Sequence, residues 1–169
     1  MRRVYMDHSA TTPVRAEVAE EMYKYIIDDF GNPTSLHSFG RQVRNAVEEA
    51  RENVAVSIGA KTNEIVFTSG GTESDNMAIH GVAHANKNKG NHIITSAVEH
   101  HAVINTVKAL GKEGFTITIV PVDKHGVVDP DDVANAITEK TILVTIMHAN
   151  NEVGTIQPIQ EISKITREH

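Results

Sequence analysis

Apolar residues recur along this chain at two spacings, and the spacing changes at about residue 60. Before that point they repeat with the period of an amphipathic helix. We expect one helix to begin at Thr12-Pro13, because threonine caps helices and proline suits the first helical position. A longer helix is expected over residues 38–58, with Gly59 in the usual position to end it.

After that point, short apolar runs alternate with helical patterns. Strands are expected over residues 64–68, 92–96, 116–120 and 141–146. A helix is expected after each of them: over 73–86, over 101–113, from Asp129-Pro130 and from Pro158. Strands that alternate with helices predict an α/β fold, in which a mostly parallel sheet is covered by helices on both faces.

Three polar loops follow expected strands and are the candidate sites of chemistry. They span residues 69–76, 97–101 and 148–154. In parallel sheets, ligands bind beyond the carboxyl ends of the strands. We therefore expect the functional residues to lie in these loops.

Composition and charge exclude several classes of protein. The chain has 169 residues with a net charge of −6 and no cluster of lysine and arginine, so we expect no nucleic-acid partner. No apolar run reaches membrane-spanning length and the start is too polar for a secretory signal, so we expect no membrane and a cytoplasmic location. The chain has no cysteine, which excludes disulfides, thiolate metal sites and a thiol nucleophile within it.

The loop over residues 69–76 has the chemistry of an anion site. Ser69-Gly70-Gly71 forms a turn without bulky side chains, and Thr72 is a candidate N-cap with Asp75 in the capping-box position. Free backbone N–H groups and the positive end of a helix dipole would then face one point, which a phosphate commonly occupies. An ordinary turn between strand and helix is the alternative.

Histidines are frequent and offer several possible roles. Of the adjacent His100 and His101, we expect at most one to face a site, where it could stack on a flat ligand, shuttle a proton or bind a metal. A partly exposed histidine at a helix start is the alternative. His80 and His84 lie four residues apart, as metal ligands on a helix can, but no third ligand follows at a suggestive spacing. We therefore expect no metal.

The loop over residues 148–154 carries two amides and a carboxylate, in Asn150-Asn151-Glu152. These groups could hydrogen-bond a ligand, or they could serve only the geometry of the turn. The chain has no GxSxG, Walker or GxGxxG motif, so the hydrolase, nucleoside-triphosphatase and Rossmann interpretations lack their signatures.

Five stretches together resemble the cysteine desulfurases of the NifS/IscS type, which are pyridoxal-phosphate (PLP) enzymes of aminotransferase class V. The stretches are YMDHSATTPV, FGNPTSLHSFG, EIVFTSGGTESDN, HIITSAVEHHAV and TILVTIMHANNEVGTIQP. The resemblance implies a three-layer αβα aminotransferase-like large domain, present only in part, with its first four strands. It also implies an N-terminal arm over residues 1–13, followed over residues 14–169 by the N-terminal part of the PLP-binding domain.

The resemblance assigns roles to individual residues. Gly71 and Thr72 would contact the phosphate of PLP, although the family usually has alanine at the position of Gly71. His100 would stack on the pyridine ring and could shuttle a proton as a catalytic residue. Asn151 would bond the phenolic oxygen of the ring. The stretch Ala10-Thr11-Thr12 and the loop Asn32–His37 would line the site.

The resemblance also implies what the chain lacks. The lysine that holds PLP covalently, the aspartate of the pyridine nitrogen, the persulfide cysteine and the substrate-binding arginine would all follow residue 169. We therefore expect the chain to be truncated before the lysine-bearing half. We also expect it to be inactive unless it belongs to a complete polypeptide or meets a complementary C-terminal chain.

The implied reaction takes sulfur from L-cysteine, giving alanine and an enzyme persulfide. The sulfur would serve iron–sulfur cluster assembly or another delivery, through an acceptor such as a scaffold protein, and the family is homodimeric. Two alternatives stay open. One is another PLP lyase of the same group, similar to selenocysteine lyase, and the other is a non-catalytic remnant or partner module.

The implied sheet order places strand 92–96 between strands 116–120 and 141–146. It separates strand 64–68 from these three by strands that would follow residue 169. That strand would then expose an unpaired apolar edge. We therefore expect the chain alone to be poorly stable or prone to aggregation.

Overall fold

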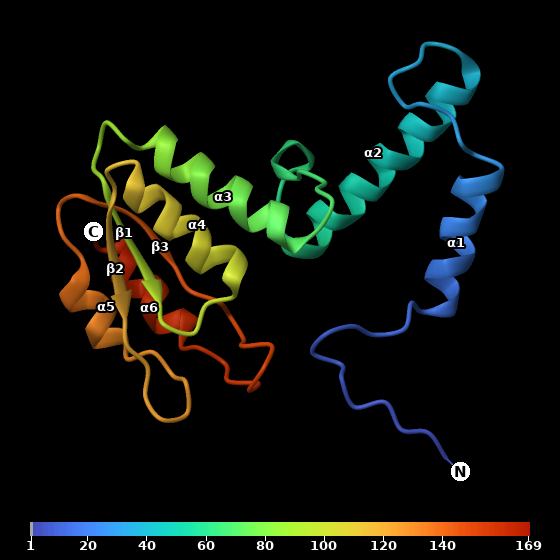
Figure 1. The fold of residues 1–169 in the computed structure, drawn as a ribbon. Helices are drawn as coiled ribbons and strands as arrows, with labels where there is room; N and C mark the ends of the chain where they lie inside the picture. Colours follow the sequence, from blue (N-terminus) through green and yellow to red (C-terminus); the bar gives the residue numbers. More distant parts are fainter. Residues whose placement is uncertain (1) are drawn as a thin grey trace. The chain divides into compact units, whose positions relative to one another are not determined.

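The computed structural model describes residues 2–169, which form ten helices and strands (Figure 1). The chain divides into two compact units, one that ends at Phe67 and one over Thr68–His169. The first unit contains helices only, and the second contains the sheet.

The first unit holds helices α1 (Ala16–Ile27) and α2 (Ser38–Ile58) and the short 3₁₀ helix η1 (Thr62–Glu64). The bounds predicted for α2 are confirmed, and Gly59 ends the helix in the left-handed conformation at φ 69°. The predicted start of the first helix at Thr12-Pro13 is wrong. The cap is Arg15, whose carbonyl oxygen accepts the first helical hydrogen bonds, from the N–H groups of Val18 and Ala19.

The strand predicted over residues 64–68 is also wrong. Glu64 closes η1, and Ile65 is extended but pairs with no strand among the described residues. The extended segment is held instead by Arg51 of α2, which donates to the Ile65 carbonyl at 2.7 Å and lies over the Phe67 ring at 4.9 Å. Backbone becomes a strand only when a neighbour pairs with it. Val66 and Phe67 are accordingly 63% and 49% exposed.

The second unit is built on three parallel strands, β1 (His92–Ser96), β2 (Thr116–Val120) and β3 (Thr141–Thr145). Their order is β2-β1-β3, as predicted, and Ile93 pairs with Ile117 on one side and Leu143 on the other. Every residue of β1 is buried, which is typical of the central strand of a parallel sheet.

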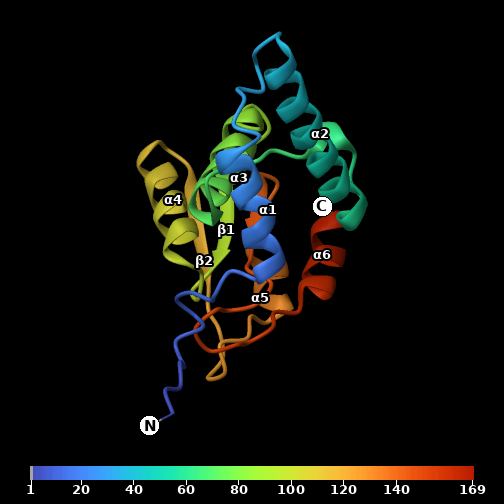
Figure 2. The same ribbon diagram turned by 90° about the vertical axis from the view of Figure 1, so that its right-hand side faces the viewer.

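Helices cover both faces of this sheet and make three layers (Figures 1 and 2). On one face α3 (Gly71–Ala85) and α4 (His101–Lys112) pack around Ile93. On the other face α5 (Pro130–Ala136) and α6 (Ile159–Arg167) pack around Ile94. Successive side chains of a strand point to opposite faces, so these two isoleucines supply the two halves of the core. The predicted αβα arrangement is confirmed.

His92, one of the ten histidines, has a structural role at the start of β1. Its two ring nitrogens lie 2.8 Å from the hydroxyl groups of Thr118 on β2 and Thr141 on β3. Burial lowers the pKa of His92, so its imidazole is held in the neutral form. The ring therefore joins all three strands.

Among residues 2–169, no helix is both long and apolar enough to cross a membrane.

Candidate functional site

The glycine loop leads into α3 by a different cap from the one predicted. Gly70 is the N-cap and α3 begins at Gly71, so Thr72 lies inside the first turn and does not cap it. The capping box with Asp75 is wrong, because Glu73 reaches back instead and its carboxylate accepts from the N–H and the hydroxyl of Ser69, both at 2.6 Å. These bonds, the hydroxyl one first, lower the pKa of Glu73 and keep it ionised.

The backbone at the start of α3 is open. Apart from the adjoining residues and the nearby helix backbone, no atom lies within 4 Å of the point where a Cβ would stand on Gly70 or Gly71. The first N–H groups of a helix have no partner within it, and the helix dipole makes this end positive. Glu73 binds the donors of Ser69 rather than those of the first turn. A phosphate group can therefore approach the N–H groups of Gly71 and Thr72.

His100 is the cap of α4. Its Nδ1 accepts a hydrogen bond from the N–H of Ala102 at 3.1 Å, so in the neutral ring the proton is on Nε2. The bond holds the ring in one orientation. The ring itself is exposed and offers Nε2–H as a donor.

The structure brings Thr72 and His100 together in one shallow hollow between α3 and α4. Asn76, His80, His101 and Thr106 also line this hollow. Both histidines of the pair line this hollow, whereas at most one was expected to face a site. The chain turns from extended at His100 to helical at His101, so the alternation of a regular element does not apply there.

Asn151 does not line this hollow. It is exposed in the loop after β3, and its amide donates to the side chain of Glu152 at 3.2 Å. Its neighbour Asn150 has a structural role: it donates to the Val98 carbonyl at 3.0 Å and accepts from the N–H groups of the next turn. The loop that carries Asn151 is therefore fastened to the loop before His100.

Glu99 is the second residue that joins these loops, although its sequence position predicts no role. Its Oε1 accepts from the Ser96 hydroxyl at 2.6 Å and from the Met147 N–H at 2.9 Å. Burial raises the pKa of Glu99, and the nearby charge of Asp75 raises it further against the effect of the two hydrogen bonds. No sequence spacing could have identified this role, because Met147 lies 48 residues from Glu99 along the chain.

We expect Glu99→Gln to leave the protein at least as stable as the wild type at neutral pH. The amide oxygen can still accept both hydrogen bonds, and it carries no charge to bury. Glu99→Ala should cost about 1–3 kcal/mol, because the donors of Ser96 and Met147 lose their acceptor. Equilibrium urea unfolding of the three proteins measures both effects.

The pH dependence provides the control. Because the folded pKa of Glu99 lies above its unfolded value, this group is most favourable when protonated. Its contribution to stability is therefore lost as the pH rises through the raised pKa. The Gln variant should lack this loss, and an identical pH profile for both proteins would contradict the assignment.

A further group of possible ligands lies on α3 and at the end of α4. His84 Nε2 is 2.9 Å from a carboxylate oxygen of Glu113, and His80 lies one turn before His84. Glu113 was missed from the sequence because it is far from both histidines along the chain.

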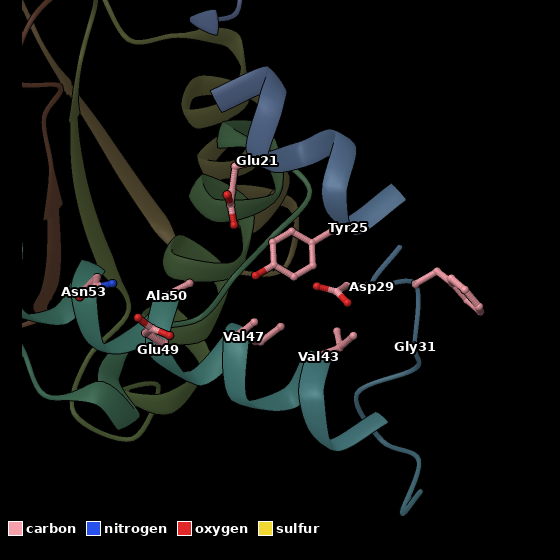
Figure 3. Close-up of a pocket in the computed structure, with 11 residues that line it drawn as sticks. Glu21, Tyr25, Asp29, Gly31, Val43, Val47, Glu49, Ala50 and Asn53 are labelled. Atoms are coloured by element: carbon pink, nitrogen blue, oxygen red, sulfur yellow. The ribbon is translucent and has the colours of Figure 1, made fainter. Parts of the chain in front are cut away.

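A separate groove lies in the first unit, between α1 and α2 (Figure 3). Tyr25 of α1 points toward α2, where Val43 and Val47 form the apolar floor. Glu21 and Glu49 also line it. None of the residues that the sequence analysis assigned to PLP contact lines this groove.

Comparison with known proteins shows the same relationship in sequence and in structure. The family model of aminotransferase class V matches residues 4–169. A cysteine desulfurase IscS of Dictyoglomus turgidum is 61% identical over 168 residues, and one of Methanosarcina thermophila is 56% identical over 168 residues. These matches include 99% of this chain but only 43% and 42% of the two relatives.

Two solved structures show the same family relationship. A NifS-like protein superposes with a TM-score of 0.95 at 43% identity, over 99% of this chain and 46% of the other. A structure described as SspA in complex with cysteine superposes with a TM-score of 0.92 at 41% identity, over 98% and 48%. The chain therefore spans less than half the length of these relatives. The chain therefore belongs to the aminotransferase class V family.

Proposed function

We propose that this chain is the phosphate-binding part of a PLP-dependent cysteine desulfurase. The observation that carries the proposal is the open start of α3 at Gly71, with Thr72 lining the same hollow as His100. Relatives at 61% and 56% identity are named cysteine desulfurases, and a structural relative is described in complex with cysteine. The reaction we propose is removal of sulfur from L-cysteine, which leaves alanine.

In this proposal the phosphate of PLP lies at the N–H groups of Gly71 and Thr72, with the Thr72 hydroxyl as a further donor. Backbone N–H groups at the start of a helix can bind a phosphate dianion without a positively charged side chain. The arm over residues 1–13 and the partial domain over residues 14–169 are part of the same proposal. PLP, when bound, supplies an electron sink for the substrate.

His100 and Asn151 then act on the ring. The Nδ1 of His100 is used by the Ala102 N–H, so only its Nε2 is left to hold or move a proton at the bound molecule. Asn151 lies in a loop that the side chains of Glu99 and Asn150 tie to the segment before His100. From there its amide would donate to the phenolic oxygen of PLP.

Sulfur transfer needs a thiol, and this sequence has no cysteine. We propose that the thiol comes from a longer polypeptide or from a second chain, and that a protein acceptor takes the sulfur onward. The inactivity of the chain alone stays a prediction. Alanine formed from cysteine by the purified chain with PLP would contradict it.

The test of the proposed site is binding of pyridoxamine 5'-phosphate, which has the ring and phosphate of PLP but cannot condense with lysine amines. Thr72→Val should weaken binding about 10- to 100-fold, because a hydrogen bond to a charged group contributes about 1.5–3 kcal/mol. His100→Asn should also weaken it, since asparagine can still cap α4 but has no ring to stack. Equilibrium dialysis measures the affinity.

Thr62→Val is the matched control. Thr62 is exposed in η1 and does not line the hollow, so affinity should be kept. Pyridoxamine without phosphate should bind far more weakly to every variant. Equal affinity of the wild type, Thr72→Val and His100→Asn would contradict the proposed site.

A further inference from the structure

Three side chains of the sheet-containing unit converge on one point outside the core. His80 and His84 lie one turn apart on the same face of α3, with ring centroids 5.6 Å apart. Glu113 is the residue that ends α4, and its carboxylate lies 2.9 Å from His84 Nε2. One ligand atom from each of the three lies within 4.8 Å of the other two.

The helices that carry these side chains are held firmly against each other. Ile79 and Ala83 of α3 share a buried cluster with Val107 and Leu110 of α4. The hydroxyl of Thr106 on α4 also donates to the side chain of Asn76 on α3, at 2.8 Å. The backbones of the three residues are therefore positioned by the core and do not depend on the His84–Glu113 contact.

The ligand set has the chemistry of a zinc site. Two imidazoles and one carboxylate are a common protein set for Zn²⁺, with bonds of about 2.0–2.2 Å. In a tetrahedral site the ligand atoms are then roughly 3.3 Å apart, so these side chains would have to move closer than their present spacing of within 4.8 Å. His84 and Glu113 have side chains 49% and 47% exposed, so a metal ion can enter from solvent and keep a water as its fourth ligand.

We propose that His80, His84 and Glu113 bind a divalent transition-metal ion, with Zn²⁺ as the ion that fits best. The ion would replace the hydrogen bond between His84 and Glu113 and join α3 to the end of α4. Thr72 lies in the first turn of one of these helices, and His100 is the cap of the other. The bound ion would thus link α3 and α4, the two helices that line the hollow, and the metal site can form without PLP.

The test is titration of the chain with Co²⁺ and Zn²⁺ in the absence of PLP, on protein without a histidine tag. Tetrahedral Co²⁺ gives visible absorption that Zn²⁺ should displace. His80→Ala, His84→Ala and Glu113→Gln should each weaken Zn²⁺ binding by about tenfold or more, at least the effect seen when an outer partner of a metal ligand is lost. Zn²⁺ should also raise the Tm of the wild type, and much less that of the variants.

Exposed histidines outside the cluster supply the control for weak surface binding. His125→Ala should leave the affinity unchanged. The proposal is overturned if His125→Ala weakens binding as much as the cluster variants, or if Glu113→Gln binds as the wild type does. Glu113→Gln keeps the size and hydrogen-bonding reach of the side chain. This variant therefore tests the proposed metal site even if a histidine variant fails to fold.

Discussion

Ile93→Ala is expected to lower the free energy of unfolding by about 2–5 kcal/mol. Ile93 is fully buried in the central strand, where it contacts both neighbouring strands and the helices of one face. Removal of its side chain leaves a cavity between the sheet and the helices of that face, and a close-packed core relaxes only partly into such a space. A loss of this size is a large fraction of the stability of a small domain.

Ile119→Ala is the matched control. Ile119 has the same side chain and lies in the neighbouring strand β2, but it is 44% exposed. Ile119→Ala should lower the free energy of unfolding by no more than about half as much as Ile93→Ala, because less apolar surface is exposed to water on losing this side chain's contacts. Equilibrium urea unfolding, monitored by circular dichroism, measures both. An equal decrease in the free energy of unfolding for Ile93→Ala and Ile119→Ala would show that the core is not centred on β1.

The amide hydrogens of α1 are expected to exchange at least about a hundredfold faster than those of α4. Both helices have twelve residues, but α4 buries five of them and α1 buries none. Large apolar side chains of α1 that are exposed include Val18, Met22, Tyr23, Ile26 and Ile27. A helix without buried contacts opens locally at little cost, whereas α4 should open only with its unit.

Exchange followed by mass spectrometry at several protein concentrations measures this difference. If apolar faces of the first unit associate between molecules, protection of α1 should rise with concentration, in line with the expected tendency to aggregate. Protection of α1 equal to that of α4 at every concentration would contradict the prediction. The amides of β1 provide an internal reference for a fully buried element.

The parts of the fold that were predicted from the sequence are those with local signals. Strand β1 and helix α2 have the predicted bounds, because apolar runs, helical spacing and a terminal glycine are all properties of short stretches. The wrong predictions concern a strand that needs a pairing partner and helix starts at which several residues could act as the cap. Ile65, Val66 and Phe67 form an apolar run that begins extended, but no strand is beside it in the described chain.

The site shows the same division. The sequence predicted a site at the loop before α3 and at the histidine that starts α4, and the structure brings Thr72 and His100 to one hollow. It did not identify Glu99 as the tie between two loops or Glu113 as a neighbour of His84. Both depend on side chains from separate strands or helices, whose approach follows from packing and has no signature in sequence spacing.

The central place of β1 has a consequence for the order of folding. β1 precedes both of its neighbours in sequence, so during synthesis it has no partner until α4 and β2 have emerged from the ribosome. Pairing with β3 closes a loop roughly twice as long as pairing with β2, an added entropy cost of only about 0.6 kcal/mol. We therefore expect the β1–α4–β2 segment to form first and to act as the template on which β3 docks, with a nascent chain most vulnerable to misassociation before Val120 is made.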